Sequence, residues 1–362
     1  MRKHYSIKTK LPLNLKPEDF YLFKNKINYK IPELKVKKLK NVFVSHYGLC
    51  LKNFLLVNKS AENLIGTSGK NFYCKFYKKV LEQYLVCKYG KSLKSIKLYN
   101  DNKYLLIYTS WFGYFSWLTQ CIPRLMMVKK NLDKYILIYP ESWEHKDFIK
   151  QSLSIFPVKQ KKVIPDGTHL FIKNLILPEV KPWTFKFNPV TVNNVRDFFY
   201  KYTESGSRLT AQVTKNLTWK NNLGNKIYVS REKAEKRKFA NEKQVQNTVK
   251  NYGFSVINFE DFSFFEQIVI MKNTQYLISI HGAALTNINF MRPDSYVLEL
   301  TNKVYKNKDH RFPFWRLSSA LNINYYIQFC ETENTKKNSI FDKNLFADIN
   351  ELQTNLNLML KH

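Results

Sequence analysis

The sequence is poor in acidic residues, glycine and cysteine. Its 28 Asp and Glu residues stand against 59 Lys and Arg residues, which gives a formal net charge of +31, and its 362 residues include only 10 glycines. The 5 cysteines are scattered and form no CxxC pair, so neither a disulfide framework nor a zinc site is indicated. A reducing cytoplasm is therefore the expected location.

Long apolar runs are also missing. No run approaches the roughly 18 residues that a membrane span requires, and no apolar stretch follows the basic N-terminal segment. We therefore expect neither a signal peptide nor a transmembrane helix. The motifs GxGxxG, GxxxxGKS/T, GxSxG and HExxH do not occur, so the usual marks of dinucleotide-binding, P-loop, esterase and zincin proteins are lacking.

The positive charge has three interpretations. Lys is spread along the whole chain beside abundant Asn, Ile, Phe and Tyr, a mixture that a low-GC genome tends to encode. The charge also suits an anionic membrane surface or an acidic polymer, and clustered Lys and Arg would suit nucleic acid. Specific nucleic acid is the least favoured partner, because no recognisable motif accompanies the charge.

The length and the order of elements predict two α/β domains. Residues 1–40 read as an N-terminal arm lying on the first domain, 41–178 as that domain, 179–330 as the second domain, and 331–362 as a C-terminal helix. Pro178, Pro182 and Pro189 mark the expected crossing between the domains. Strands and helices alternate in the second half with short connections, which predicts a parallel, doubly wound sheet.

Four segments carry further expectations about structure. Residues 104–108 read as a buried strand, and residues 63–95 show mixed helical and loop character. Apolar residues recur at helical spacing over residues 111–131, where Pro123 predicts a kink or a break. Residues 343–360 are expected to form one terminal helix.

A strand, a tight turn, a short helix and a second strand follow one another near residue 281. The apolar run at 276–280 stops at His281 and Gly282, small residues open the helix, and Pro293 precedes the apolar run at 296–300. Such a turn aims the free N–H groups of a helix start into the crevice at the carboxyl end of a strand. The sequence therefore predicts an anion site at this turn.

Three segments keep the order and spacing of one family's motifs. Residues 113–125 read GYFSWLTQCIPRL, residues 229–242 read VSREKAEKRKFANE, and residues 279–299 read SIHGAALTNINFMRPDSYVLE. Together with Trp111 they resemble glycosyltransferase family 61, of the type that makes bacterial capsules and other surface polysaccharides. The resemblance covers residues 111–300.

The resemblance implies a GT-B-like fold with two Rossmann-like domains facing a cleft. It also implies an inverting glycosyltransferase that uses a nucleotide-sugar donor, bound by the second domain. The expected acceptor is a growing surface glycan or a lipid-linked glycan, at the inner membrane face. No DxD sequence occurs, so neither a metal nor a cofactor is expected. The alternatives are a non-catalytic nucleotide-sugar or glycan-binding relative and, more remotely, a basic nucleic-acid-binding protein.

The residue types at the second and third motifs suit a sugar nucleotide. The pyrophosphate gains charge as the glycosidic bond breaks, and guanidinium forks match phosphate oxygens. Glu299 ends a strand and is expected to accept ribose hydroxyls, whereas Asn241 and Glu242 look mainly structural, as a helix cap and a first-turn acid. The donor-binding candidates are Arg231, Arg237, His281, Gly282, Ala283, Asn287 and Glu299.

The first motif departs from the family's pattern at two positions. Ser116 stands where the family usually has His, and Gln120 where it often has an acidic residue. A serine cannot by itself deprotonate an acceptor hydroxyl at neutral pH. Three explanations stay open: the His is not the base, another group supplies it, or this chain is impaired. The acceptor-side candidates are Ser116, Arg124 and His46, and the alternative bases are His46, His145, Asp166 and His169.

Overall fold

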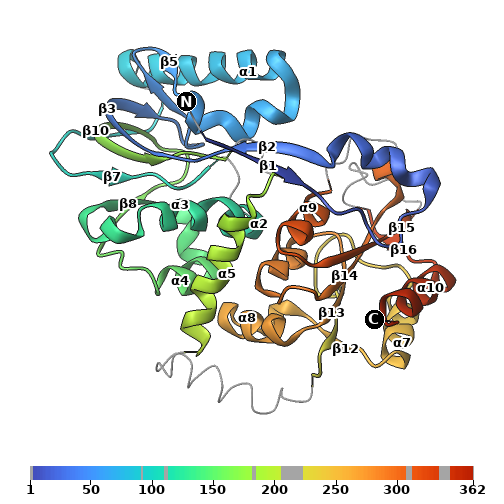
Figure 1. Ribbon diagram of the computed structural model, residues 1–362. Helices are drawn as coiled ribbons and strands as arrows, with labels where there is room; N and C mark the ends of the chain where they lie inside the picture. Colours follow the sequence, from blue (N-terminus) through green and yellow to red (C-terminus); the bar gives the residue numbers. More distant parts are fainter. Residues whose placement is uncertain are drawn as a thin grey trace. The chain divides into compact units, whose positions relative to one another are not determined.

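Two β-sheets, one in each of two units of the chain, form the framework (Figure 1). The computed structural model describes residues 3–90, 93–109, 113–181, 185–204, 223–306, 312–333 and 343–361. Unit 1 comprises residues 1–5 and 30–186, and unit 2 comprises residues 6–29 and 187–362. A separate two-stranded sheet pairs β1 (His4–Lys8) with β2 (Asn28–Pro32).

Unit 1 contains a mixed sheet with strand order β5-β4-β3-β10-β7-β8-β9, in which β6 also pairs with β10. β6 to β10 run parallel to one another, whereas β3, β4 and β5 are antiparallel. The strands are β3 (Val36–Val44), β4 (Cys50–Lys52), β5 (Leu55–Leu56), β6 (Ser95–Leu98), β7 (Tyr104–Leu105), β8 (Ile136–Pro140), β9 (Gln160–Ile164) and β10 (His169–Pro178).

Helices cover both sides of this sheet, with α1 on one side and α3 and α4 on the other (Figure 1). The described helices of unit 1 are α1 (Asn58–Tyr89), α2 (Tyr114–Ser116), the π-helix η3 (Trp117–Cys121), α3 (Ile122–Met127), η4 (Lys129–Lys134), η5 (Glu141–His145) and α4 (Asp147–Leu153).

Unit 2 contains a sheet with strand order β12-β11-β13-β14-β15-β16. The strands are β11 (Lys226–Val229), β12 (Ser255–Ile257), β13 (Tyr276–Ile280), β14 (Tyr296–Asn302), β15 (Asn324–Thr332) and β16 (Leu345–Phe346). The first five strands in this order are parallel and β16 is antiparallel, so the parallel prediction holds for those five strands and the sheet as a whole is mixed.

The unit 2 sheet is covered on both faces (Figure 1). Val249 of α7 and Leu356 of α10 pack on one face, and an aromatic cluster of Phe199, Phe264 and Phe290 joins α5, α8 and η8. The described helices are η1 (Pro17–Leu22), η2 (Lys24–Lys26), α5 (Pro189–Glu204), α7 (Glu242–Asn251), η7 (Phe259–Asp261), α8 (Phe264–Asn273), η8 (Ala283–Phe290), η9 (Lys303–Lys306), α9 (Pro313–Ala320) and α10 (Ile349–Met359).

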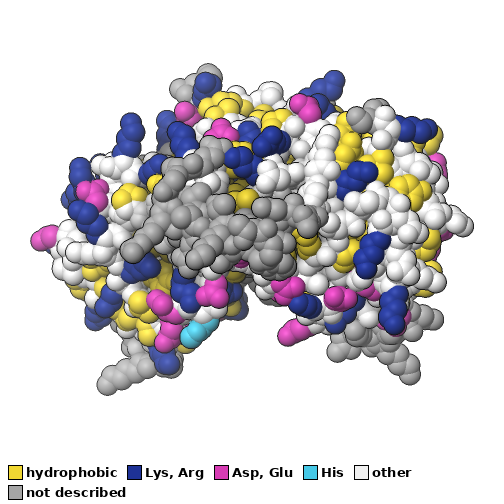
Figure 2. All heavy atoms as spheres, turned by 90° about the horizontal axis from the view of Figure 1, so that it is seen from below, with side chains coloured by type: hydrophobic (Ala, Val, Ile, Leu, Met, Phe, Trp, Pro, Cys, Tyr) yellow, Lys and Arg dark blue, Asp and Glu magenta, His cyan; other side chains and the backbone are white. Residues whose placement is uncertain are grey.

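Charged side chains of both signs share the surface. On the face that Figure 2 shows, Lys and Arg are spread among Asp and Glu and do not gather into one basic patch. None of the described helices combines the length and the apolarity that a membrane crossing needs.

Residues 58–89 form one continuous helix, α1, in place of most of the mixed segment expected at residues 63–95. Its C-terminal half places Val80, Tyr84 and Cys87 on one helix face, against Phe43 and other apolar residues of the unit 1 sheet. Burial of this face stabilises a helix that local sequence pattern alone leaves ambiguous.

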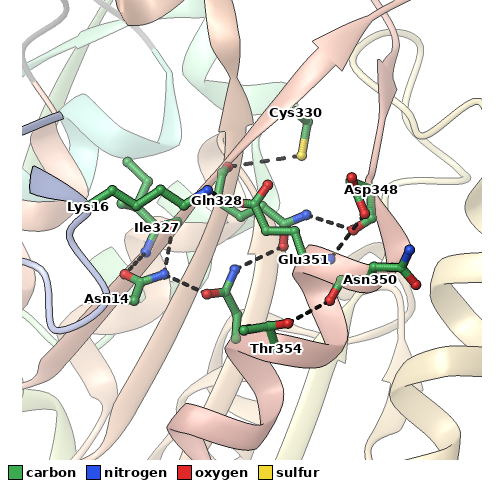
Figure 3. Close-up of polar contacts among 10 residues, drawn as sticks. Asn14, Lys16, Ile327, Gln328, Cys330, Asp348, Asn350, Glu351 and Thr354 are labelled. Carbon is green, nitrogen blue, oxygen red and sulfur yellow. Dashed lines mark hydrogen bonds and ion pairs between the residues drawn. The ribbon is translucent and has the colours of Figure 1, made fainter. Parts of the chain in front are cut away.

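The expectation that the N-terminal arm, residues 1–40, lies on the first domain is partly wrong, because residues 6–29 belong to unit 2 and only residues 1–5 and 30–40 belong to unit 1. The backbone N–H of Leu13 donates to the carbonyl of Tyr325 at 2.9 Å. The Asn14 side chain donates to the carbonyl of Ile327 (2.8 Å) and accepts from its N–H (3.0 Å) (Figure 3). Because β16 pairs only with the last residues of β15, the rest of that strand edge needs other partners, which the arm supplies.

The expected terminal helix at 343–360 is also partly wrong. Leu345 and Phe346 pair with β15, and α10 begins only at Ile349. Asp348 caps this helix, because its carboxylate accepts a hydrogen bond from the Glu351 N–H at 3.0 Å (Figure 3). The cap and the strand pairing decide where the helix starts.

Candidate functional site

In the turn after β13, Gly282 lies against the side chain of Arg231. Gly282 has extended backbone angles, and a Cβ atom built on it would lie 2.8 Å from the Arg231 Nη1 atom. The predicted short helix follows as the 3-10 helix η8, whose first residue, Ala283, is exposed. The first N–H groups of a helix have no partner within it. Gly282 therefore lets the Arg231 guanidinium approach the start of η8.

Two arginines converge at this turn. Arg231 directly follows the loop residue after β11, and its Nε and Nη2 atoms donate to the carbonyls of Arg237 and Lys236, both at 3.2 Å. Arg237 Nη1 lies 3.4 Å from the carbonyl oxygen of His281. Arg237 itself has a left-handed backbone (φ 58°), which is uncommon for a residue with a side chain.

Neither guanidinium has an ion-pair partner among the described residues. The buried Nε atom of Arg237 also lacks a hydrogen-bond partner in that part of the chain. Burial and the neighbouring Arg237 charge lower the pKa of Arg231. Two half-buried cations that repel one another are stabilised by an anion between them.

His281 belongs to a buried chain of three polar side chains. Its Nδ1 atom contacts Oε1 of Glu299, and the hydroxyl group of Tyr325 donates to Oε2 of the same carboxylate. Glu299 is 0% exposed and Tyr325 is 3% exposed. Burial and the Glu299 carboxylate raise the pKa of the Tyr325 phenol, which therefore stays a donor. The contact between Nδ1 and the Glu299 carboxylate fixes the orientation of the His281 ring at the turn.

The buried position of Glu299 bears on its expected role. Both carboxylate oxygens already accept hydrogen bonds, and no surface of the side chain is exposed. This geometry gives no support to a direct contact with a ribose. It favours a role in orienting His281, since a carboxylate behind a histidine fixes the ring and its tautomer.

Asn287 is likewise buried, at 1% exposure, and its side-chain amide donates to Gln267 Oε1 at 2.9 Å. Gln267 in turn donates to the carbonyls of Phe259 and Phe262, both at 3.0 Å. Asn287 therefore ties η8 to α8 and the segment before it. Among the donor-binding candidates, the structure brings together Arg231, Arg237, His281, Gly282 and Ala283.

The profile of the family Glycosyltransferase 61 matches residues 114–298. The chain belongs to glycosyltransferase family 61. No curated protein matches the sequence. The matched segment contains both arginines and His281, and Glu299 comes directly after it. Family membership implies that the chain transfers sugars.

Asn241 and Glu242 of this family 61 chain are structural, as expected, although Asn241 makes no capping hydrogen bond. The Asn241 side chain instead pairs with the backbone of Ala347, donating at 2.8 Å and accepting at 3.0 Å. Glu242 accepts from the hydroxyl groups of Tyr228 and Ser230. These contacts join α7 to β11 and to the segment before α10.

The first motif folds as α2, the π-helix η3 and α3, and Trp111 lies outside the described residues. The helical segments follow one another without a gap from Tyr114 to Met127, so residue 123 does not break the chain of helices. The π-helical turn ends at Cys121, and the helix changes type two residues before Pro123, which lacks an N–H. Ser116 and Gln120 are 6% and 2% exposed. Neither amide atom of the Gln120 side chain has a partner in the described part of the chain.

Arg124 is buried, and each of its three guanidinium nitrogens donates to a backbone carbonyl. Its guanidinium donates to Pro178 (2.8 Å), Leu106 (2.9 Å), Ile107 and Tyr108. Strand β7 pairs only at residues 104–105, shorter than the expected 104–108, and the three following carbonyls turn to this arginine. Burial lowers the pKa of Arg124 to about 10, so it stays charged at neutral pH. These contacts are those of a structural residue.

His46 and His169 lie together, with ring centroids 5.0 Å apart. His169 opens β10 and pairs with the first residue of β6, so both histidines lie at the amino end of the parallel strands. Burial lowers the pKa of both, and the pKa of His169 falls to about 4. Sites in parallel α/β sheets lie at the opposite, carboxyl end.

Three titratable groups follow the carboxyl ends of unit 1 strands. His145 ends η5 after β8, and Asp166 follows β9 and accepts from the Ser142 N–H at 3.3 Å. Lys181 follows β10 and is buried, which lowers its pKa to about 7. Sequence reasoning missed Lys181, because nothing in the sequence distinguishes it from many solvated lysines.

Tyr325 was missed for a similar reason. It lies outside all three motifs, and only the register of β14 and β15, in which Val297 pairs with Tyr325, reveals that it neighbours Glu299. The one signal in the sequence was the alternation of side chains along β15, which places Tyr325 on the same face of the sheet as Ile327, the residue paired with Glu299. Among the described residues, no group of three or more His, Cys, Asp or Glu side chains could hold a metal ion.

A cavity of about 500 Å³ in unit 2 lies between the N-terminal arm, β15 and α10. Ion pairs Lys16 to Glu351 (2.7 Å) and Lys303 to Glu331 flank it. None of the donor-binding candidates is among its lining residues.

Proposed function

We propose that this family 61 chain moves a sugar, with inversion and without a metal ion, from a nucleotide-sugar donor to a hydroxyl group of a growing surface glycan. The observation that carries the proposal is the pair of half-buried guanidinium groups at Gly282, without ion-pair partners in the described part of the chain. A pyrophosphate is an anion of the right charge and reach for such a pair.

In the proposed donor site, Arg231, Arg237 and the start of η8 bind the pyrophosphate. Cations and N–H groups fixed before reaction stabilise the charge that grows on the leaving phosphate. His281, oriented by Glu299, contacts a phosphate oxygen or a ribose hydroxyl through its imidazole ring. Arginines and helix N–H groups supply what a metal ion supplies in other transferases, which supports metal independence.

We propose that the base of unit 1 is one of the groups at the carboxyl ends of its strands, and Lys181 is the leading candidate. Its burial and its pKa of about 7 match a general base that works near neutral pH. The turnover rate should rise as the pH increases through about 7, because the neutral amine is the active form. Lys181→Met should lower turnover at least 100-fold.

His46→Ala is the matched control for this test, because His46 lies at the amino end of the strands. Equal losses in the two variants would assign the effect to folding, and an unchanged turnover in Lys181→Met would leave His145 and Asp166 as the bases to test. Both residues follow carboxyl ends of strands.

The two-unit organisation supports the GT-B arrangement as a proposal. Each unit has its own α/β sheet, as the Rossmann-like domains of that fold do. A lipid-linked glycan at the inner face of the cytoplasmic membrane is the proposed acceptor, and the net charge of +31 supports an anionic surface nearby.

A panel of nucleotide sugars tests the function. One donor should raise the melting temperature, and an acceptor extract should then release free nucleotide from it. Binding of a nucleotide sugar without release of nucleotide in any extract would favour the alternative, a non-catalytic relative. Ser116 and Gln120, which replace residues usual in the family, support that alternative. Absence of binding by every nucleotide sugar would overturn the donor site. A gel shift on generic DNA tests the remote alternative.

A further inference from the structure

An exposed surface of unit 1 combines aromatic rings with lysines and takes no part in the proposed transfer. Six of the fourteen exposed large hydrophobic residues among the described ones lie at residues 54–99: Phe54, Leu55, Leu85, Tyr89, Leu93 and Tyr99. We define the docking patch as Phe54, Tyr84, Lys88, Tyr89, Lys97 and Tyr99. These residues come from the β4–β5 hairpin, the last turns of α1 and β6 with the residue after it.

The hairpin holds Phe54 at the surface in an unfavourable backbone conformation. Asn53 and Phe54 have φ angles of 49° and 61°, the left-handed region, which is costly for a bulky aromatic residue. The Tyr77 hydroxyl group fixes this turn by donating to the Phe54 carbonyl at 2.8 Å. The Phe54 ring is nevertheless 48% exposed, so the strain presents an apolar side chain to the outside.

One lysine lies among the aromatic rings. The Lys88 Nζ atom is 5.6 Å from the ring centre of Phe54, 5.5 Å from that of Tyr84 and 5.1 Å from that of Tyr89. The rings therefore gather around one ammonium group and form a continuous surface. Tyr89, at the end of α1, is 73% exposed.

The patch opens into a cavity of about 510 Å³ that reaches the apolar residues of β3 and β10. Lys88 and Lys97 line it together with Phe54, Tyr84 and Tyr99, and its lining residues include no Asp or Glu. The wall is thus cationic at the rim and apolar at the base. A ligand that matches it carries negative charge next to an apolar chain.

We propose that the docking patch binds unit 1 to the surface of an anionic phospholipid bilayer. The lysines contact headgroup phosphates, while Phe54, Tyr89 and Tyr99 enter the interfacial layer, where amphipathic aromatic side chains are favoured. A free phosphate ion would use the lysines but not the exposed rings. The patch acts whether or not the chain transfers sugars, so its test contains neither donor nor acceptor.

Co-sedimentation of the full chain with vesicles tests the proposal. Phosphatidylcholine vesicles with about one third phosphatidylglycerol should bind the chain, and pure phosphatidylcholine should bind it weakly. Lys88→Gln with Lys97→Gln should weaken binding roughly 30-fold, at about 1 kcal/mol per lysine. Lys159→Gln with Lys162→Gln is the matched control, because it removes the same charge from exposed positions of the same unit.

A second pair of variants tests the aromatic contribution. Phe54→Asn with Tyr89→Ser removes two of the three exposed rings of the patch, and Asn tolerates the left-handed turn at residue 54. Val163→Ser with Val190→Ser, at positions 44% and 60% exposed, is the control. Each double variant of the docking patch should bind the vesicles more weakly, whereas its control variant should bind them as the wild type does.

Three results would overturn the proposal. Equal losses in patch and control variants would mean that the total charge of +31 binds the vesicles without a defined site. Unweakened vesicle binding by both double variants of the docking patch would mean that the membrane contact lies elsewhere on the chain. Displacement by inorganic phosphate at constant ionic strength would identify a phosphate-ion site.

Discussion

Arg124 of unit 1 and the arginine pair of unit 2 are all fully or half buried, yet their surroundings differ. Four backbone carbonyls accept hydrogen bonds from Arg124, and they come from two segments of unit 1 that it holds together. Arg231 and Arg237 contact carbonyls of their own loop and of His281, and the Arg237 Nε has no hydrogen-bond partner among the residues that the structure describes. An arginine whose three guanidinium nitrogens are all hydrogen-bonded to backbone carbonyls stabilises the fold, whereas a nitrogen left over near a second cation indicates an anion site.

The largest expected effect is at Arg124. Arg124→Met should lower the free energy of unfolding by roughly 3 kcal/mol or more, since four buried carbonyls lose a charged donor. Urea titration measures this loss. Arg231→Met, in the same titration, should change stability by less than about 1 kcal/mol. A stable Arg124→Met variant without turnover would give Arg124 the acceptor role that the sequence also permits.

The next largest effect is on the donor. Arg237→Ala should weaken nucleotide-sugar binding roughly 100-fold, because about two charge-assisted hydrogen bonds are lost, while the melting temperature stays near that of the wild type. His281→Ala should act in the same direction. Calorimetric titration measures both, with Arg292→Ala as a control at an exposed position of unit 2. Unchanged affinity in both site variants would remove the donor assignment.

Smaller effects should follow from the groups behind His281. Glu299→Gln should weaken donor binding about 10-fold and reduce the share of the tautomer protonated at Nδ1, which nitrogen chemical shifts of the His281 ring report. Tyr325→Phe should have a weaker effect of the same kind.

Tyr228→Phe is the matched control for the Tyr325 variant. It removes a hydrogen bond from a buried tyrosine to Glu242, in the same sheet but away from His281. The two phenylalanine variants should lose similar stability, and only Tyr325→Phe should change the His281 signal. A His281 ring insensitive to both Glu299 and Tyr325 would contradict the orienting role.

The last effect is on the pH dependence of stability and comes from His169, whose surroundings differ from those of His281. The folded-state pKa of His169, about 4, lies below its ordinary value of 6.5, so the unfolded chain takes up a proton first as the pH falls. Stability should be complete above pH 6.5 and decline between 6.5 and about 4. His169→Gln should flatten this decline in melting curves, and an equally steep decline would assign it to other groups.

Local pattern determined much of unit 2. The strand Tyr276–Ile280 has the expected bounds, because a short apolar run between Gln275 and the His-Gly turn has few alternatives. The start of α8 is likewise fixed locally, by the capping box that Ser263 and Glu266 form. Such signals are contained within a few residues and need no partner from elsewhere.

The partners of the candidate residues could not be predicted in this way. Arg124 and the Pro178 carbonyl are 54 positions apart in sequence, and Tyr325 reaches Glu299 across 26. The sequence also does not reveal at which end of the sheet a residue lies, and this is why His46 looked suitable as a base. Sheet order and direction place it at the amino end.

By itself, then, the sequence determined the two α/β halves, the motifs of family 61 and the turn at His281 and Gly282, since all of these are written in neighbouring residues. Only the tertiary structure decided that Glu299 is buried behind His281, that Arg124 is bound by carbonyls and that residues 6–29 of the N-terminal arm belong to unit 2. Those outcomes depend on which strand edges and carbonyls remain unpaired once the sheets have formed, and every buried polar group must then find its partner.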